Sequence, residues 1–128
     1  MKIALAATFS LMLTLMSTLA LTAEAPFNQA QFDAARAAGK PVAVVFHADW
    51  CPICRAQAPL LKQLTQTPEL QPVTLYIANF DTETALKKSL GVTKQSTIVV
   101  FNRGREIGRS TGDTQQENLA ALLRRAIS

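Results

Sequence analysis

The sequence has few of the residues that bind metal ions. It contains two cysteines and one histidine. A zinc site usually takes four ligands, most of them from these two residue types, so the chain is short of ligands for a zinc centre. A Cu(I) site needs only two thiolates, and that alternative stays open.

The sequence also lacks the pattern of a nucleic-acid-binding surface. Its formal net charge is +4, but the positive residues are scattered over several segments without interleaved aromatic residues. Scattered charges of this kind are typical of solvated faces. No internal repeat or low-complexity stretch appears outside the N-terminal segment, and 128 residues suit one domain. We therefore expect a single-domain, monomeric protein with no nucleic-acid partner.

Charge is almost absent from the N-terminal segment. After Lys2, residues 3–16 are uncharged and mostly apolar, which is typical of the hydrophobic region of a secretory signal peptide. Cleavage after Ala20, Ala23 or Ala25 would satisfy the requirement for small residues. The segment therefore predicts an exported protein, located in the periplasm or outside the cell.

A retained membrane anchor is the alternative. Residues 3–23 approach the roughly 20 apolar residues that a spanning helix needs. Threonine and serine within this stretch, and small residues at its end, favour cleavage. We take residues 1–23 as the signal peptide and residues 24–128 as the folded domain, so that any contact with the membrane is transient.

The apolar pattern of the folded domain switches between the periods of helices and strands. In chain order it predicts helix 28–38, strand 42–46, helix 52–64, strand 73–77, helix 81–90, strands 97–101 and 106–110, and a helix from 114 onward. Strands linked by helices are expected to be parallel, and turn residues at 102–104 add an antiparallel hairpin at the sheet edge. The predicted fold class is α/β, with a mixed central sheet flanked by helices.

Several residues have the chemistry of helix ends. Asn28 and Asp81 are expected to cap the helices that follow them, and residues 114–117 (TQQE) form a capping box. Gly91 is expected to end the helix that Asp81 begins.

The helix predicted over residues 52–64 contains a proline and an apolar stripe. Pro59 should kink this helix, because a proline removes one backbone hydrogen bond. The stripe should pack on the sheet. Its members are Ile53, Ala56, Leu60, Leu61 and Leu64.

Both cysteines lie in the sequence Trp50-Cys51-Pro52-Ile53-Cys54, between a buried strand and a helix. A thiol at the start of a helix faces unpaired N–H groups and the positive end of the helix dipole, which favour the thiolate. Cys51 should therefore be the nucleophile, and Pro52 suits the first helical position because an N–H there would have no partner. Cys54, one turn further on, should be the more buried thiol and can close a reversible disulfide with Cys51.

A static disulfide is the structural alternative. It would close a very short loop and stabilise the fold little, because the entropic gain grows with loop length. The pattern therefore favours a redox pair whose sulfurs carry the electrons themselves, with no further cofactor.

Residues 46–55 (FHADWCPICR) resemble the strand-to-active-site segment of the thioredoxin superfamily. Residues 91–92 (GV) and 96–104 (STIVVFNRG) resemble its last helix-to-hairpin segment, and Gly112 matches a glycine beside the site. Residues 39–42 (GKPV), placed before residues 48–51 (ADWC), are especially similar to the C-terminal thioredoxin-like domain of the periplasmic electron carrier DsbD. The resemblance covers essentially the whole folded domain, and it implies a thioredoxin-like fold and thiol–disulfide oxidoreductase activity.

One departure from the family lies in the loop that pairs with the substrate backbone and shields the thiols from metals. The matching residues here are Gln95, Ser96 and Thr97, and Ser96 stands in the place of the family's cis-proline. No proline follows Pro72, and a cis bond before another residue type costs about 2.5–4 kcal/mol. We therefore predict a trans Gln95–Ser96 bond. The expected effect is weaker substrate binding, access for a metal, or a tolerated variation.

Other departures concern proton transfer and charge. Val45 occupies the place of the buried aspartate that assists proton transfer in thioredoxin, and Ile77 roughly matches its lysine partner. His47 replaces an aromatic residue. A protonated imidazole would lower the pKa of Cys51, but a packing role at the strand end is favoured. Trp50 is expected to shape the surface around Cys51.

The sequence thus predicts an exported enzyme in which Cys51 attacks a disulfide and Cys54 resolves the mixed disulfide. His47, Trp50, Pro52 and Ile53 form the predicted surroundings, and no metal is assigned. Neither residue between the cysteines is a histidine, and the DsbD-like flanks favour a reductant or electron relay. Its partners would be protein disulfides and a redox protein that resets the pair. The alternatives are a Cu(I)-binding module and a thioredoxin-like interaction domain without catalysis.

Overall fold

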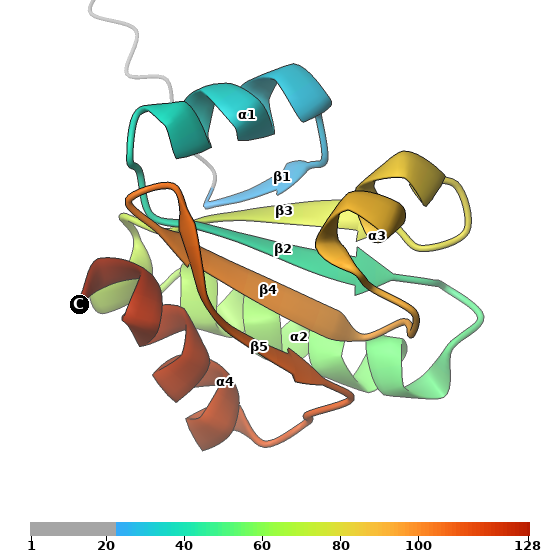
Figure 1. Cartoon of the computed structure of the whole chain (residues 1–128). Helices are drawn as coiled ribbons and strands as arrows, with labels where there is room; N and C mark the ends of the chain where they lie inside the picture. The colour runs from blue at the N-terminus through green and yellow to red at the C-terminus, as the bar shows by residue number, and fades with distance from the viewer. Residues whose placement is uncertain (1–22) are drawn as a thin grey trace, which may run out of the picture.

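The computed structural model describes residues 23–128, and the predicted signal peptide lies outside them except for its last residue. Five strands form one sheet (Figure 1). The strands are β1 (Glu24–Pro26), β2 (Val42–His47), β3 (Thr74–Asn79), β4 (Thr97–Asn102) and β5 (Arg105–Thr111). The helices are α1 (Gln29–Ala37), α2 (Pro52–Thr65), α3 (Thr84–Leu90) and α4 (Gln116–Arg124), with short 3₁₀ turns at Pro68–Leu70 and Arg125–Ile127. No helix within residues 23–128 has the length and apolar character to cross a membrane.

The sheet has the order β1-β3-β2-β4-β5 and is mixed. β1, β3 and β2 are parallel, whereas β4 is antiparallel to β2 and β5 is antiparallel to β4. The predicted class is confirmed, but the expectation that all helix-linked strands are parallel was wrong for β4. α2 has 14 residues and carries the chain back along the sheet, whereas α3 has only 7. At about 1.5 Å per residue α3 is too short for that return, so the chain enters β4 at the end where it left β3.

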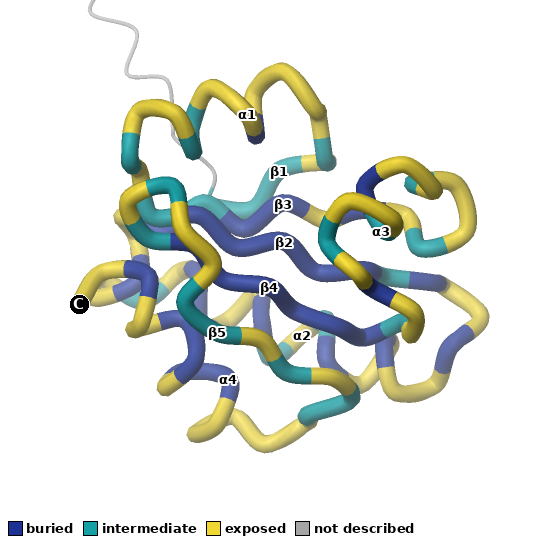
Figure 2. Tube along the Cα trace, viewed as in Figure 1, coloured by how far each residue is buried: buried dark blue, intermediate teal, exposed yellow. Residues whose placement is uncertain are grey.

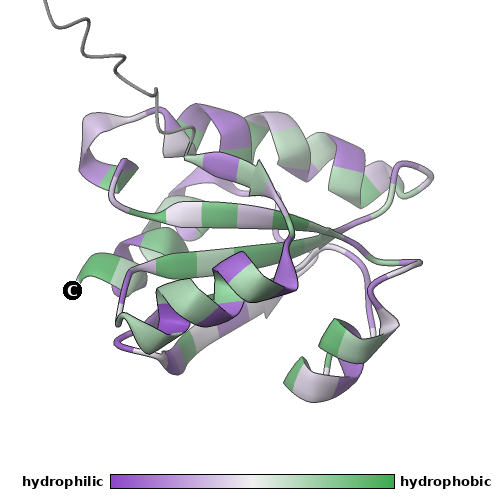
Figure 3. Cartoon of the chain, turned by 90° about the horizontal axis from the view of Figure 1, so that it is seen from above, coloured by the Kyte–Doolittle hydropathy of each residue, from purple (hydrophilic) through white to green (hydrophobic). Residues whose placement is uncertain are grey.

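Helices cover both faces of the sheet. α2 and α4 pack on one face, and α1 and α3 on the other (Figure 1). β2 and β4 lie in the centre and are buried along almost their whole length (Figure 2). Polar and apolar residues alternate around the helices (Figure 3), as expected for helices that bury one stripe. The continuous apolar runs of β2 and β4 follow from this double cover.

Some helix ends match the sequence predictions. Asn28 accepts a hydrogen bond from the N–H of Gln31 at 2.9 Å and caps α1. Gly91 ends α3 with a left-handed φ of 65°. Arg103 and Gly104 also have positive φ and form the turn of the predicted hairpin.

Two predicted caps were wrong. α3 begins at Thr84, and Asp81 instead accepts a hydrogen bond from the indole of Trp50. α4 has Gln115 at its N-cap with no side-chain cap bond, so residues 114–117 form no capping box. Asp113 accepts from the N–H of Gln115 at 2.8 Å, and this local turn replaces the box.

The buried face of α2 also differs from the prediction. Ile53 is 48% exposed, and Ala56 is exposed as well. Leu61 and Leu64 are buried as predicted, and Leu60 packs partly buried against the same core. The helix also buries Cys54, Gln57 and Thr65, which were not in the predicted stripe. The stripe is therefore rotated toward the redox pair, because Cys54 and Gln57 rather than their apolar neighbours point inward. Pro59 lies inside α2, which continues to Thr65.

β1 is a short edge strand that the sequence did not reveal. It pairs with β3, with Glu24 opposite Leu75, and the carbonyl of Ala23 accepts from the N–H of Leu75 at 2.7 Å. Three residues are too few to show a strand period.

Candidate active site

Cys51 is the N-cap residue of α2, directly after the loop that follows β2. Its Sγ accepts a hydrogen bond from the N–H of Cys54 at 3.3 Å, and Pro52 occupies the first turn. The sulfur thus takes the place of the oxygen that usually caps a helix, where N–H groups and the helix dipole stabilise negative charge.

The pKa values of the two thiols move in opposite directions. Burial raises the pKa of Cys51, but hydrogen bonds from the Cys54 N–H, the Cys54 thiol, Ser96 and the Ile53 N–H outweigh burial and lower that pKa from 9.0 to about 7. Burial raises the pKa of Cys54, and the hydrogen bond with Ser96 only partly offsets it. Near neutral pH the site therefore holds a partly ionised Cys51 above a protonated Cys54.

Cys51 and Cys54 are free thiols, 4% and 1% exposed. They lie within hydrogen-bonding reach of each other. Ser96 Oγ lies 2.7 Å from Cys54 Sγ and 3.6 Å from Cys51 Sγ. The structure therefore brings together three residues that the sequence singled out, and Ser96 contacts both sulfurs.

The backbone around Ser96 is held in an unusual conformation. Its φ is 62°, in the left-handed region that costs a non-glycine residue roughly 1–2 kcal/mol. Its N–H donates to the carbonyl of Phe46 at 2.8 Å, and its carbonyl accepts from the N–H of Gly112 at 3.0 Å. No cis peptide bond occurs in residues 23–128, so the Gln95–Ser96 bond is trans, as predicted. Gln95 is half-buried beside it.

Exposed apolar side chains surround the buried pair. Trp50 is 58% exposed, and its Nε1 donates to Asp81 Oδ2 at 2.8 Å. Ile53 and Pro52 are also exposed. His47 Nε2 lies 2.8 Å from Asp49 Oδ1, so its ring pairs with that carboxylate rather than with a sulfur. Trp50, Pro52 and Ile53 thus form an apolar rim around the pair, and the hydrogen bond to Asp81 holds the indole of Trp50 in place.

Comparisons with known proteins agree with this geometry. The family model for thioredoxin matches residues 23–125.

The chain belongs to the thioredoxin family.

It is 31% identical over 96 residues to a thioredoxin of Alicyclobacillus acidocaldarius, which covers 75% of this chain and 90% of that protein. A thioredoxin of Chlamydia pneumoniae is 34% identical over 92 residues, 72% of this chain and 87% of that protein.

Solved structures give the same result. The crystal structure of Trxlp from Edwardsiella tarda superposes with a TM-score of 0.75 at 37% identity, covering 78% of this chain and 96% of that chain. The Malassezia sympodialis thioredoxin has the same fold, with a TM-score of 0.72 at 23% identity over 82% of this chain and 93% of that one. The protein is a thioredoxin-like thiol–disulfide oxidoreductase.

Gln57 is a part of this thioredoxin-like site that sequence reasoning missed. It is 1% exposed, and its Nε2 donates to the carbonyls of Asp113 at 2.9 Å and Ser96 at 3.4 Å. It therefore ties α2 to the Ser96 loop and to the segment after β5. Its position one turn after Cys54, on the same helix face, was the available signal.

Thr97 supports the thioredoxin-like loop from its other side. Its Oγ1 donates to the carbonyl of Lys94 at 2.7 Å and lies 2.9 Å from Thr111 Oγ1. Gly112 follows with a φ of 74°. The loop is thus tied to β5, but only Ser96 of its three residues has a side chain bonded to the sulfurs.

A hollow of about 190 Å³ lies behind Cys54. Val45 and Ile77 line its apolar part. Glu24, His47 and Lys62 are the titratable groups that share it with Cys54. Burial raises the pKa of the Glu24 carboxyl, and the charge of Lys62 partly offsets this.

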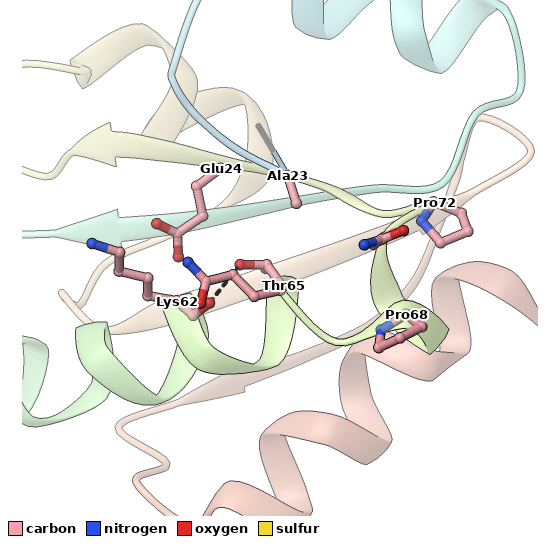
Figure 4. Close-up of a pocket in the computed structure, with 8 residues that line it drawn as sticks. Ala23, Glu24, Lys62, Thr65, Pro68 and Pro72 are labelled. Atoms are coloured by element: carbon pink, nitrogen blue, oxygen red, sulfur yellow. Dashed lines mark hydrogen bonds between the residues drawn. The ribbon is translucent and has the colours of Figure 1, made fainter. Parts of the chain in front are cut away.

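A larger hollow of about 840 Å³ lies between β1 and the C-terminal part of α2 (Figure 4). Glu24, Lys62, Thr65 and Pro72 are among its lining residues, and neither cysteine is. It is therefore separate from the redox pair. Within residues 23–128, no three His, Cys, Asp or Glu side chains gather where they could hold a metal ion.

Proposed function

We propose that this thioredoxin-like protein is a reductant or electron relay for protein disulfides in the cell envelope. Cys51 acts as the nucleophile, Cys54 resolves the mixed disulfide, and the pair carries the electrons without a further cofactor. The observation that supports this best is the placement of Cys51 as the N-cap of α2, with a pKa of about 7, above a protonated Cys54.

Two exchanges transfer the electrons. The Cys51 thiolate attacks one sulfur of a substrate disulfide, and the other substrate sulfur leaves as a thiolate that takes a proton from water. Cys54 then attacks Cys51 Sγ and releases the second substrate thiol. The products are a Cys51–Cys54 disulfide and two substrate thiols, and a redox partner protein must return two electrons and two protons to reset the pair.

The moderate pKa of Cys51 favours the reducing direction. When the pKa of the nucleophilic cysteine lies far below 7, its thiolate stabilises the reduced protein, and the disulfide is then a strong oxidant. A pKa of about 7 keeps much of the thiolate available at neutral pH without that extreme stabilisation. Protein substrates would bind the apolar rim of Trp50 and Ile53, which flanks Cys51.

The envelope location is supported by the uncharged apolar residues 3–16. The pairing of Glu24 with Leu75 in β1 favours cleavage at or before Ala23 over cleavage after Ala25, which would remove most of that strand. We therefore infer that the mature protein begins close to Glu24.

Insulin reduction with dithiothreitol as the recycling reductant tests the activity. We expect turbidity to develop faster with the protein than with dithiothreitol alone, and Cys51→Ser to abolish the difference. Ser89→Ala on the exposed surface of α3 is a matched control. An unmodified protein no faster than Cys51→Ser would contradict the proposal and favour a non-catalytic interaction domain.

Location, substrates and the copper alternative need separate measurements. The full chain with a Cys54→Ala change should be recovered from the envelope fraction with proteins trapped on Cys51. Recovery from the cytosol, or no trapped protein, would contradict the envelope role.

Stoichiometric Cu(I) binding that resists glutathione and depends on both thiols would favour the metal-binding module.

A further inference from the structure

We propose that the Ser96 hydroxyl relays the proton of Cys54 when Cys54 resolves the mixed disulfide on Cys51. Ser96 would then be a catalytic residue, since its Oγ contacts both reacting sulfurs, at 2.7 Å from Cys54 Sγ and 3.6 Å from Cys51 Sγ. The inference rests on the proposed exchange chemistry and names the group that moves its proton.

The resolving step needs such a group. Cys54 is deeply buried, with 1% exposure, and burial raises its pKa, so it stays protonated at neutral pH and must lose its proton before or during attack. A hydroxyl can accept that proton and donate its own in the same event. Ser96, itself 1% exposed, lies beside the sulfur that must be deprotonated.

The loop holds this hydroxyl in place. The backbone of Ser96 has a φ of 62°, although the residue is not a glycine. Both of its backbone polar groups are bonded, to Phe46 and to Gly112. Strained backbone at a buried polar side chain is typical of functional positions. At Ser96 this backbone conformation places the hydroxyl close to both sulfurs.

The other groups packed around Cys54 are less well placed. On β2, Val45 is apolar, and Phe46 offers only its carbonyl, 4.0 Å from Cys54 Sγ. On α2, the amide of Gln57 donates to backbone carbonyls. These groups can accept or donate at most one hydrogen bond to the sulfur, and none can pass a proton on.

The titratable rivals lie across the hollow behind Cys54. They are Glu24 on β1, His47 on β2 and Lys62 on α2. The ring of His47 is already paired with Asp49. No hydrogen bond joins any of these three groups to Cys54 Sγ, whereas Ser96 Oγ contacts that sulfur directly. This makes Glu24 and His47 the comparison positions for a test.

In the mixed disulfide, Cys51 Sγ is bonded to a substrate sulfur. The Cys54 proton moves to Ser96 Oγ, the Cys54 Sγ–Cys51 Sγ bond forms, and the Cys51–substrate bond breaks. The electron pair of the broken bond stays on the substrate sulfur, which receives the hydroxyl proton of Ser96. Ser96 ends as a neutral hydroxyl, and the substrate leaves as a thiol.

Leaving-group dependence provides a sharp test. The reduced protein is mixed with excess glutathione disulfide, the reaction is quenched with acid, and the Cys51–glutathione intermediate is followed by mass spectrometry. The same step is measured with Ellman's reagent, whose thionitrobenzoate leaves without needing a proton. We expect Ser96→Ala to slow the glutathione release on the order of 100-fold, the low end for a positioned proton-transfer group, and the thionitrobenzoate release clearly less.

Three variants separate a relay from a structural role. Ser96→Gly also removes the hydroxyl but accepts a φ of 62° without strain, so it should be as slow as Ser96→Ala and should fold if the alanine variant does not. Ser89→Ala, which removes an exposed hydroxyl on α3, should match the unmodified protein. Glu24→Gln should leave the release rate unchanged.

Two results would overturn the relay. One is a release rate in Ser96→Gly equal to that of the unmodified protein, because the residue would then act only through loop shape. The other is a slower glutathione release in Glu24→Gln together with an unchanged rate in Ser96→Ala. That result would mean that Glu24, across the hollow, accepts the proton of Cys54. Failure of insulin reduction with normal glutathione release would count against the proposed function and leave the relay standing.

Discussion

The backbone N–H of Cys54 donates a hydrogen bond to the Sγ of Cys51 at 3.3 Å. The nucleophile is therefore stabilised by the backbone of the residue that later resolves it. This bond belongs to the first turn of α2. Of the hydrogen bonds that lower the pKa of Cys51, those from Cys54 and Ile53 are local to this turn, and the one from Ser96 is long-range.

The alkylation of Cys51 should report this ionisation. The pKa of Cys51 is lowered from 9.0 to about 7, so the rate of iodoacetamide reaction at Cys51 should rise with a midpoint near pH 7. Mass spectrometry of the reduced protein, with Cys54→Ala as a second background, gives the profile. A midpoint close to 9 would mean that the helix start does not stabilise the thiolate.

The same shift should make the stability of the reduced protein depend on pH. A lowered pKa stabilises the fold fully above the unfolded value of 9.0, and this contribution is lost as the pH falls toward about 7. The raised pKa of Cys54 acts in the opposite direction at higher pH. Urea unfolding under reducing conditions should therefore show a rise in stability from pH 7 toward 9 that is absent in Cys51→Ala. Equal slopes in the two proteins would contradict it.

Asp81 should position the indole of Trp50. Asp81→Ala removes the acceptor of the 2.8 Å bond. One hydrogen bond contributes about 0.5–1.5 kcal/mol, so we expect kcat/KM for a protein disulfide to fall about twofold to tenfold. Reaction with small disulfides should not change. Trp50 is the single tryptophan, so its fluorescence reports the freed ring. Asp33→Ala, at an exposed aspartate on α1, is the control, and an equal loss there would remove the specific role of Asp81.

Gln57 should stabilise the loop as well as the fold. Gln57→Leu keeps the side chain large but leaves the Asp113 carbonyl without its side-chain donor. An unsatisfied buried polar group costs about 1–3 kcal/mol. The Asp113 carbonyl is only part-buried, so we expect a loss of about 1 kcal/mol in urea unfolding. Gln63→Leu, at an exposed position of the same helix, should have little effect. Equal stability of the two variants would show that the buried amide bonds contribute nothing.

Restoring the family's proline is expected to harm this chain. Ser96→Pro removes the N–H that donates to Phe46 at 2.8 Å and imposes a negative φ where the loop has 62°. We expect a loss of roughly 2 kcal/mol or more, as for a lost buried hydrogen bond combined with an incompatible backbone. Thermal unfolding measures it. Unchanged stability would mean that the loop can refold around a proline.

The sequence predicted the fold class, most strands and the pair of cysteines, because long apolar runs and the position of Cys51 at a helix start are strong signals. It failed where competition between neighbours decides the outcome. Asp81 has the chemistry of a helix cap but bonds Trp50, 31 positions away. Ile53 is more apolar than Gln57, yet Gln57 is buried because carbonyls from two other segments meet its amide.

Other failures concern relations between segments. The direction of β4 depends on whether α3 is long enough to cross the sheet, which apolar periodicity does not show. The bonds from Ser96 to the two sulfurs join residues 42 and 45 positions apart. The sequence marked Ser96 as unusual, but only the folded loop shows its hydroxyl between the thiols.

These separations divide the contacts of the site into a local group within α2 and a long-range group made by Ser96. Residues 51–54 lie within the first turn of α2, whereas Ser96 is brought beside them only when β4 pairs with β2, which closes a long loop. A chain that is still incomplete therefore carries a nucleophile without the hydroxyl that would bond its resolving thiol. In such a chain a mixed disulfide on Cys51 would be resolved more slowly, so fast exchange would require an assembled central sheet.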